Sequence, residues 1–424
     1  MRDLILLGFI VVGAAMAFRR PIYGVLTWAC LNFMSPHRLS WGFLSSLPVV
    51  VGVSAISLLT MFISKDKSKF YWNNLSILML LFTLHFSITT IFAWNPDGAF
   101  AEWDRFVKSM VFIVVVIILV NTREKIVMMV AAIAISFGFY GVKGGIFAVL
   151  TAGNHRVWGP VGTFIEDNNH LGLALLMTVP LMVFLRSTLT VTWQRHAVLG
   201  ATAITVVAVL MTYSRGAMLA TVAMGFIALM RSKQRIKGIV AIAIIGSLAL
   251  PLVPQQWFDR MNTLKAADED ESAMGRVNSW YYAFHLANDY PLTGGGARVF
   301  TPYLFATTSY APEPDRYHDA HSIYFEILGE QGWVGLAIFL SIFIGGGLKA
   351  QKLRKLALKQ GNKDMSVLSD CLWYSLFAYG TAGTFLGLGY FDYPYTIIAL
   401  LIVVERHLKE EQAAKEKPKL KSMM

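Results

Sequence analysis

The stretch His318-Asp-Ala-His321-Ser-Ile-Tyr-Phe-Glu-Ile-Leu-Gly-Glu-Gln-Gly332-Trp-Val-Gly335 marks the point where a polar segment gives way to a strongly apolar one. It closes the one long polar segment of a sequence that otherwise consists almost entirely of apolar runs. Ionisable residues are costly to place at the edge of a bilayer, so two histidines and several acids at such an edge indicate a functional site.

The composition around this stretch predicts an all-α polytopic membrane protein. The chain is 55% hydrophobic and only 15% charged, whereas soluble domains carry about 25% charged residues. Apolar runs near the length of about 20 residues that spans a bilayer recur throughout, and they predict about 12 transmembrane helices. The predicted spans lie near residues 4–18, 21–34, 44–63, 75–93, 106–120, 126–150, 165–186, 196–212, 216–230, 238–254, 332–349, 367–387 and 391–405.

The net charge of +11 is concentrated in short loops between these spans. Short loops rich in Lys and Arg face the cytoplasm, so the charge predicts orientation rather than nucleic-acid binding. We therefore expect N-terminal transmembrane helices over 1–250, one large periplasmic loop with helices over 251–331, C-terminal transmembrane helices over 332–405 and a cytoplasmic basic tail over 406–424. The loop at 151–164 is also expected on the outer side. Within the large loop, apolar residues recur at helical spacing from Arg276 to Ala287 and predict a partly buried helix.

Arg215 is the first candidate site residue, because the orientation rule predicts few arginines on the outer side. It lies in Tyr213-Ser-Arg-Gly216 between two spans. Ser214 would cap the next helix and leave its N–H groups and positive dipole end facing outward. Together with a guanidinium, such a helix start can bind phosphate. The alternative is an arginine that merely reaches the membrane interface.

Arg156, Arg276 and Arg298 also fall in segments expected on the outer side. Each taken alone has the alternative of an ordinary surface charge. Taken together with Arg215, they favour recognition of a diphosphate, since arginine binds phosphate oxygens in a bidentate manner that lysine cannot reproduce.

His321 is the best candidate for acid–base chemistry, because imidazole titrates near neutral pH. We expect it on a helix that begins near Asp319, with its ring against the apolar boundary. His318 would be its more exposed neighbour. Glu326 and Glu330 would share one helix face further along. The alternative for both histidines is a structural role at a helix start.

A metal site is not expected here. His318, Asp319 and His321 have no further histidine or cysteine cluster beside them, and their spacing fits no zinc pattern. The chain also lacks a nucleophile elbow, a P-loop and a dinucleotide fingerprint.

These residues resemble the bacterial O-antigen ligase family, which also contains protein O-oligosaccharyltransferases and is akin to the O-antigen polymerases. The family's mark is a histidine followed by Asn, Ser or Gln, then nine residues and Gly-x-x-Gly; here it is His321-Ser322 followed by nine residues and Gly332-Trp-Val-Gly335. Further matching segments are Ser214-Arg215-Gly216, Gly275-Arg276 through Trp280 to Gly294-Gly-Gly296, and Gly162-Thr-Phe164 followed by Asn168-Asn169. The segment from Arg20 to Phe43 resembles a branch described as O-glycosylation ligases.

The resemblance implies a C-type glycosyltransferase architecture in the bacterial inner membrane, with its active site on the periplasmic side. It implies transfer of a glycan from undecaprenyl diphosphate to a sugar hydroxyl of lipid A–core in lipopolysaccharide biosynthesis, with inversion and without metal or other cofactor. His321, Arg215 and Arg276 would be catalytic, and Arg156, Arg298, His318 and Ser322 would contact substrate. The alternatives are a protein O-oligosaccharyltransferase with a Ser or Thr acceptor, a glycan polymerase, and a lipid-linked glycan transporter.

Overall fold

The computed structural model describes all residues except 41, 233, 238, 240–254, 256–270 and 422–424. The described part is helical and contains no strand. Its helices are α1 (Arg2–Arg19), α2 (Ile22–Phe33), η1 (Pro36–Leu39), η2 (Phe43–Ser45), α3 (Val49–Ile63), α4 (Asn74–Ile91), α5 (Pro96–Leu119), α6 (Arg123–Leu150), α7 (Asn168–Thr188), α8 (Thr192–Met211), α9 (Arg215–Arg231), α12 (Glu271–Asp289), α13 (Pro302–Thr307), α14 (Ile323–Lys359), α15 (Lys363–Ala382), η5 (Gly383–Phe385) and α16 (Asp392–Lys421).

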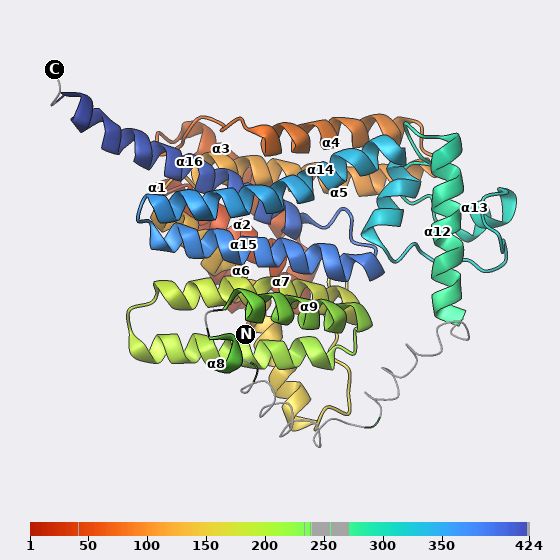
Figure 1. The fold of residues 1–424 in the computed structure, drawn as a ribbon, viewed down its shortest axis with the longest axis horizontal. Helices are drawn as coiled ribbons and strands as arrows, with labels where there is room; N and C mark the ends of the chain where they lie inside the picture. Colours follow the sequence, from red (N-terminus) through yellow and green to blue (C-terminus); the bar gives the residue numbers. More distant parts are fainter. Residues whose placement is uncertain (41, 233, 238, 240–254, 256–270, 422–424) are drawn as a thin grey trace.

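The long helices run side by side as a bundle, and α12 lies across one end of it (Figure 1). Among the described residues, five helices are long and apolar enough to cross a membrane, namely α4, α6, α7, α8 and α14. The prediction of an all-α polytopic membrane protein is therefore confirmed as to the class of fold. The total of about 12 transmembrane helices stays a prediction, and the predicted span 238–254 lies almost wholly outside the described residues.

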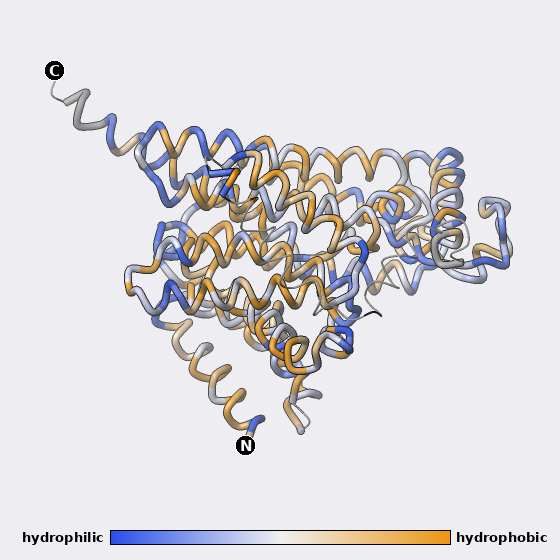
Figure 2. Tube along the Cα trace, turned by 60° about the horizontal axis from the view of Figure 1, so that its bottom comes forward, coloured by the Kyte–Doolittle hydropathy of each residue, from blue (hydrophilic) through white to orange (hydrophobic). Residues whose placement is uncertain are grey.

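Hydrophobic residues predominate along the length of the bundle, and hydrophilic residues are more frequent towards its two ends (Figure 2). In an apolar 18-residue stretch of α7, 67% of the residues are buried inside the protein, whereas in the corresponding stretch of α4 only 33% are buried. The exposed apolar residues of α4 recur at helical spacing, as expected of a face that contacts lipid. They are Ile77, Leu80, Leu81, Leu84, Ile88 and Ile91.

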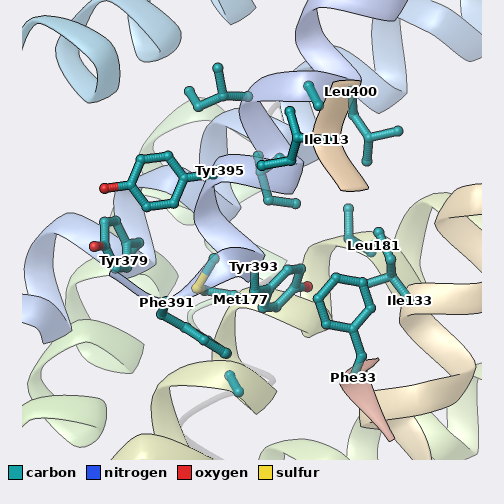
Figure 3. Close-up of a cluster of buried hydrophobic side chains, with 14 of the residues drawn as sticks. Phe33, Ile113, Ile133, Met177, Leu181, Tyr379, Phe391, Tyr393, Tyr395 and Leu400 are labelled. Carbon is teal, nitrogen blue, oxygen red and sulfur yellow. The ribbon is translucent and has the colours of Figure 1, made fainter. Parts of the chain in front are cut away.

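The core lies around the first half of α16, which is apolar on all sides and therefore buried on all sides. Residues 397–404 of this helix are at most 1% exposed. Tyr393 stacks on Phe137 of α6 with ring centroids 4.6 Å apart, close to Phe33 of α2 (Figure 3). Beyond the core, α16 continues as a helix to Lys421, so the basic segment 406–421 is helical.

A kink in α14 shapes the end of the bundle that carries the polar loops. Gly332 interrupts this helix with φ 66° and ψ −173°, a conformation essentially restricted to glycine. The interruption frees carbonyl groups, and the Gly294–Gly296 loop satisfies them: Gly295 N donates to Gly329 O at 2.9 Å and Gly296 N to Glu330 O at 3.0 Å. His85 Nε2 of α4 lies 3.0 Å from the carbonyl oxygen of Gln331. The kink is therefore held from two sides.

Candidate active site

Helix α12 fixes the segment that precedes α14. Ser279 Oγ donates to the carbonyl oxygen of His318 at 2.5 Å, and Trp280 Nε1 donates to that of Ala320 at 2.8 Å. The Trp280 ring also stacks on Phe325 with centroids 4.9 Å apart. The predicted helix over Arg276 to Ala287 is thus confirmed, and it clamps residues 318–320 to the end of the bundle.

The expected helix start near Asp319 is wrong. Helix α14 begins at Ile323 with Ser322 as N-cap, and His321 precedes it in a left-handed backbone conformation with φ 42°. The physical reason is that α12 side chains occupy the carbonyls of His318 and Ala320, which helical hydrogen bonds would otherwise use. Ser322 is 1% exposed, its hydroxyl does not cap α14, and that oxygen has no hydrogen bond to any described residue.

His318, Arg276 and His321 are brought together at this point. The ring of His318 packs on Gly275, where a Cβ atom would lie 2.1 Å from it. The rings of His318 and His321 are 6.4 Å apart. Burial lowers the pKa of His321, and the positive charge of Arg276, the residue after Gly275, lowers it further, while Asp319 opposes both. His321 is therefore held neutral, the form that can accept a proton.

His321 lines a cavity of about 1490 Å³. Other walls come from α2, α3, α5, the loop over 158–167 and the turn over 387–391. One stripe of α5 faces it at helical spacing, from Gly98 and Glu102 through Arg105 to Phe112. The wall at α3 includes Val51, which is 61% exposed. The cavity therefore combines polar walls near His321 with apolar walls that reach the surface of the bundle.

Arg298 lines the same cavity, and its guanidinium forms an ion pair with an acidic side chain. Glu102 of α5, which is 4% exposed, accepts from Arg298 Nε at 2.8 Å and from Nη2 at 2.6 Å. The predicted contact of Arg298 with the substrate would therefore compete with this ion pair, which joins the loop after Gly296 to α5.

Glu326 and Glu330 share one face of α14, as predicted, and both line the cavity. Glu326 Oε2 accepts from the backbone N–H of Gly389 at 2.8 Å. Glu330 Oε1 accepts from the backbone N–H of Arg298 at 2.7 Å. These carboxylates thereby fix the turn before α16 and the loop before α13 against the start of α14.

The sequence analysis did not single out His170 and Arg105, which both line the cavity. His170 belongs to α7, contacts the Phe164 carbonyl oxygen through Nδ1 at 3.0 Å, and is near enough for its charge to lower the pKa of His321. Arg105 lies over the Phe164 ring, 4.5 Å from its centroid. The segment Gly162-Thr-Phe164…Asn168-Asn169 was a signal for His170, which directly follows it. Arg105 gave none, because it lies among other charged residues in the first half of α5, where Glu102, Asp104 and Lys108 surround it in sequence.

Arg156 and Arg215 lie at the junction of α8 and α9. Ser214 caps α9 by accepting from Ala217 N at 3.2 Å, as predicted. The exposed Arg156 lies 5.9 Å from the Tyr213 ring centroid. The described walls of the cavity include neither arginine, nor Arg276, His318 or Ser322.

No group of three or more His, Cys, Asp or Glu side chains that could hold a metal ion occurs among the described residues. The cavity's acids have other partners; Asp167, for example, caps α7. The chemistry that the site offers from its own side chains is proton transfer at His321 and anion binding by arginines.

The helices and the site define the class: this is a multi-pass α-helical membrane protein with a polar cavity at one end of its bundle. Residues 200–340 match the family model described as O-Antigen ligase, and residues 1–190 match that of a family of unknown function. Over residues 200–340 the chain is therefore similar to the O-antigen ligase family, and this match supports the ligase and polymerase-type glycosyltransferase superfamily. No curated protein matches the chain.

Proposed function

We propose that this protein is an inverting O-antigen ligase that transfers a glycan from undecaprenyl diphosphate to a sugar hydroxyl of lipid A–core, on the periplasmic face of the inner membrane. The observation that carries the proposal is His321, which lies in the matched family region and lines a cavity with both polar and apolar walls. Such a cavity suits a substrate with a charged, glycan-bearing head and a hydrocarbon chain.

The reaction assigned to the site is a single displacement. The acceptor hydroxyl oxygen forms a bond to the anomeric carbon, and the bond from that carbon to the diphosphate oxygen breaks. The imidazole of His321 takes the hydroxyl proton, which its lowered pKa permits near neutral pH. Attack opposite the leaving group inverts the anomeric centre. The diphosphate already activates the glycan, so the step uses proton transfer and charge stabilisation alone.

Arg215 and Arg276 are assigned the role of stabilising the negative charge that develops on the leaving diphosphate. Helix α9 supports this role for Arg215, because a serine-capped N-terminus presents a positive dipole end beside the guanidinium. The assignment of Arg276 is supported by its proximity to His321, whose pKa its positive charge lowers. Arg156, Arg298, His318 and Ser322 are assigned to substrate contacts, and of these four residues Arg298 alone is among the described cavity walls.

The test is transfer by purified full-length protein in lipid nanodiscs, with an undecaprenyl diphosphate-linked glycan as donor and lipid A–core as acceptor. His321→Ala is expected to fold normally and to lose transfer. A matched control is His285→Ala, because His285 is an exposed histidine of α12 outside the described cavity walls. Near-normal transfer by His321→Ala would overturn the assignment of the base.

The acceptor is tested in cells that lack the protein, by two readouts. Loss of the lipopolysaccharide ladder alone supports the ligase. Loss of glycans from periplasmic proteins instead supports protein O-oligosaccharyltransferase, and shortened glycans on undecaprenyl diphosphate support a polymerase.

A further inference from the structure

The N-terminal region, residues 1–190, forms much of the cavity that contains His321. Its contributions come from α2, α3, α5, α6 and the loop over 158–167, whereas the O-antigen ligase match covers only residues 200–340. The region that matches a family of unknown function is therefore part of the candidate active site itself.

The acids of the cavity wall are engaged by groups of the protein. Glu102 accepts from Arg298, Glu326 from Gly389 N and Glu330 from Arg298 N. The remaining acids have partners as well: Glu166 accepts from Gly162 N, Asp167 from Asn169 N, Asp319 from the Tyr317 hydroxyl, and Asp392 from Asn32. Glu102, Glu330 and Asp392 are at most 5% exposed, so their charge is used within the protein, whereas Glu166 and Asp319 remain exposed at the wall.

The cationic side chains of the wall divide into two kinds. Arg298 is bound by Glu102, and Lys108 is bound by Asp104. Arg38 and Arg105 are left; both belong to the N-terminal region and both are exposed. No hydrogen bond from either guanidinium to another described residue is present.

Arg105 has the geometry of an anion ligand. Its guanidinium carbon lies over the Phe164 ring, 4.5 Å from the ring centroid, and this cation–π contact restricts the position of the group. Its nearest carboxylate, Glu102, is 3.5 Å from Nη2 and already accepts two bonds from Arg298. The side chain is 45% exposed. The fork of donors is therefore oriented and still open to a bidentate acceptor such as a phosphate.

An apolar surface continues from Arg105 within the same cavity. Along α5 it passes to Val111 and Phe112, and Val50 and Leu58 of α3 extend it. A cation at one end of an apolar wall that opens at α3 fits an amphiphile with a phosphate head and a hydrocarbon chain.

We propose that the N-terminal region supplies the anion-binding wall of the active-site cavity, with Arg105 as its principal residue and Arg38 as its second, and that this wall binds the phosphate group of a lipid-linked substrate. The inference rests on the proposed function. It assigns the phosphate to residues outside the matched ligase region, in addition to Arg215 and Arg276.

The experiment measures equilibrium binding to the full-length protein in nanodiscs. The probes are undecaprenyl diphosphate without a glycan, and lipid A–core, which also carries phosphate on a lipid. Arg105→Gln is expected to weaken binding of undecaprenyl diphosphate by about 10- to 100-fold, as expected for loss of a charge-assisted hydrogen bond. Arg105→Lys should recover part of the loss, because it keeps the charge without the fork.

The matched control is Arg316→Gln. Arg316 also pairs with a glutamate three residues away, at 3.0 Å from Glu313, and is 38% exposed, but it does not line the described cavity. The variant Arg316→Gln should bind both lipids with the affinity of the wild type. The variant His321→Ala should retain binding while losing transfer, which separates this inference from the assignment of the base.

Each outcome decides the question. A wild-type affinity of Arg105→Gln for both lipids overturns the inference and leaves the proposed function standing. Weakened binding of undecaprenyl diphosphate alone assigns the wall to the donor, and weakened binding of lipid A–core alone assigns it to the acceptor; either supports the inference. Absence of binding of either lipid to the wild type overturns both the inference and the proposed function.

Discussion

His321 has a left-handed backbone conformation that costs an L-amino acid about 1–2 kcal/mol. Such strain persists only where the surroundings impose it, and it is concentrated at functional sites. Here the surroundings are the α12 side chains Ser279 and Trp280, which hold the preceding carbonyls. The ring is placed by tertiary contacts, which makes its position independent of helix propensity.

The pH dependence of transfer follows from the charges around this ring. A general base must be neutral, so activity falls as pH drops through its pKa. The pKa of His321 lies below its ordinary value of 6.5, chiefly because of burial and then because of Arg276. The acidic limb of a kcat/KM profile is therefore expected below pH 6.5.

Two variants test the direction in which the neighbouring charges shift the pKa of His321. Arg276→Gln removes a positive neighbour, raises the pKa of His321 and moves the acidic limb to higher pH, even though overall activity falls. Asp319→Asn removes a negative neighbour and moves the limb to lower pH. If the limb stays in place in both variants, His321 is not the group that titrates.

At the scale of the element, the two glycines of the Gly332-Trp-Val-Gly335 motif serve one helix in different ways. Gly332 supplies the kink of α14, and a Cβ atom there would lie 2.6 Å from the Pro291 carbonyl oxygen. Gly335 lies on the next turn, where a Cβ would come within 3.0 Å of His85 Nε2. The spacing therefore reflects close packing of α14 on α4 and on the loop after α12, which places Glu326 and Glu330 in the cavity.

Gly332→Ala is expected to destabilise the protein by about 1–3 kcal/mol, because alanine is strained in this backbone conformation and its methyl group meets a carbonyl. Thermal unfolding in detergent measures the effect. Gly345→Ala in the same helix is the control, since a Cβ there meets only Leu75 at 3.6 Å, an ordinary contact. Equal melting temperatures for the two variants would show that the kink is not required.

At the scale of the whole molecule, distant segments are joined at both ends of the bundle. At the end away from α12, Arg406 of α16 is 3% exposed and donates to the carbonyl oxygens of Ile117 and Val120, both at 2.8 Å. It thereby satisfies backbone groups at the C-terminus of α5. Nearby, Glu405 accepts from Lys349 at 2.9 Å and from Asn73 at 2.8 Å. The central helix is therefore tied to α4, α5 and α14.

The orientation of the molecule is open to a direct test by cysteine labelling. In a variant with Cys30 and Cys371 replaced by alanine, Ser309→Cys should react with a membrane-impermeant maleimide on intact spheroplasts, because this exposed residue follows α13. Lys363→Cys, exposed at the start of α15, should react only after permeabilisation. The reverse pattern would contradict a periplasmic active site.

Features that depend on local order along the chain could be predicted from the amino-acid sequence. Apolar runs predicted the membrane-spanning helices, the spacing after Arg276 predicted α12, and Ser214 predicted the start of α9, because propensity, periodicity and capping act over a few residues. The spacing from His321 to Gly335 indicated a resemblance to the O-antigen ligase family, whose model matches residues 200–340. Each of these features involves neighbours in sequence.

The faces on which the helices meet could not be predicted in this way, because they depend on packing between residues far apart in the chain. Arg298 pairs with Glu102, a partner 196 residues away in the chain, and Arg105 and His170 reach the cavity of His321 from α5 and α7. Lipid is as apolar as a helix core, so hydropathy does not distinguish a lipid-facing side from a packed one. The conformation of His321 likewise depends on hydrogen bonds from α12, and the charge that faces the cavity depends on which acids have found partners.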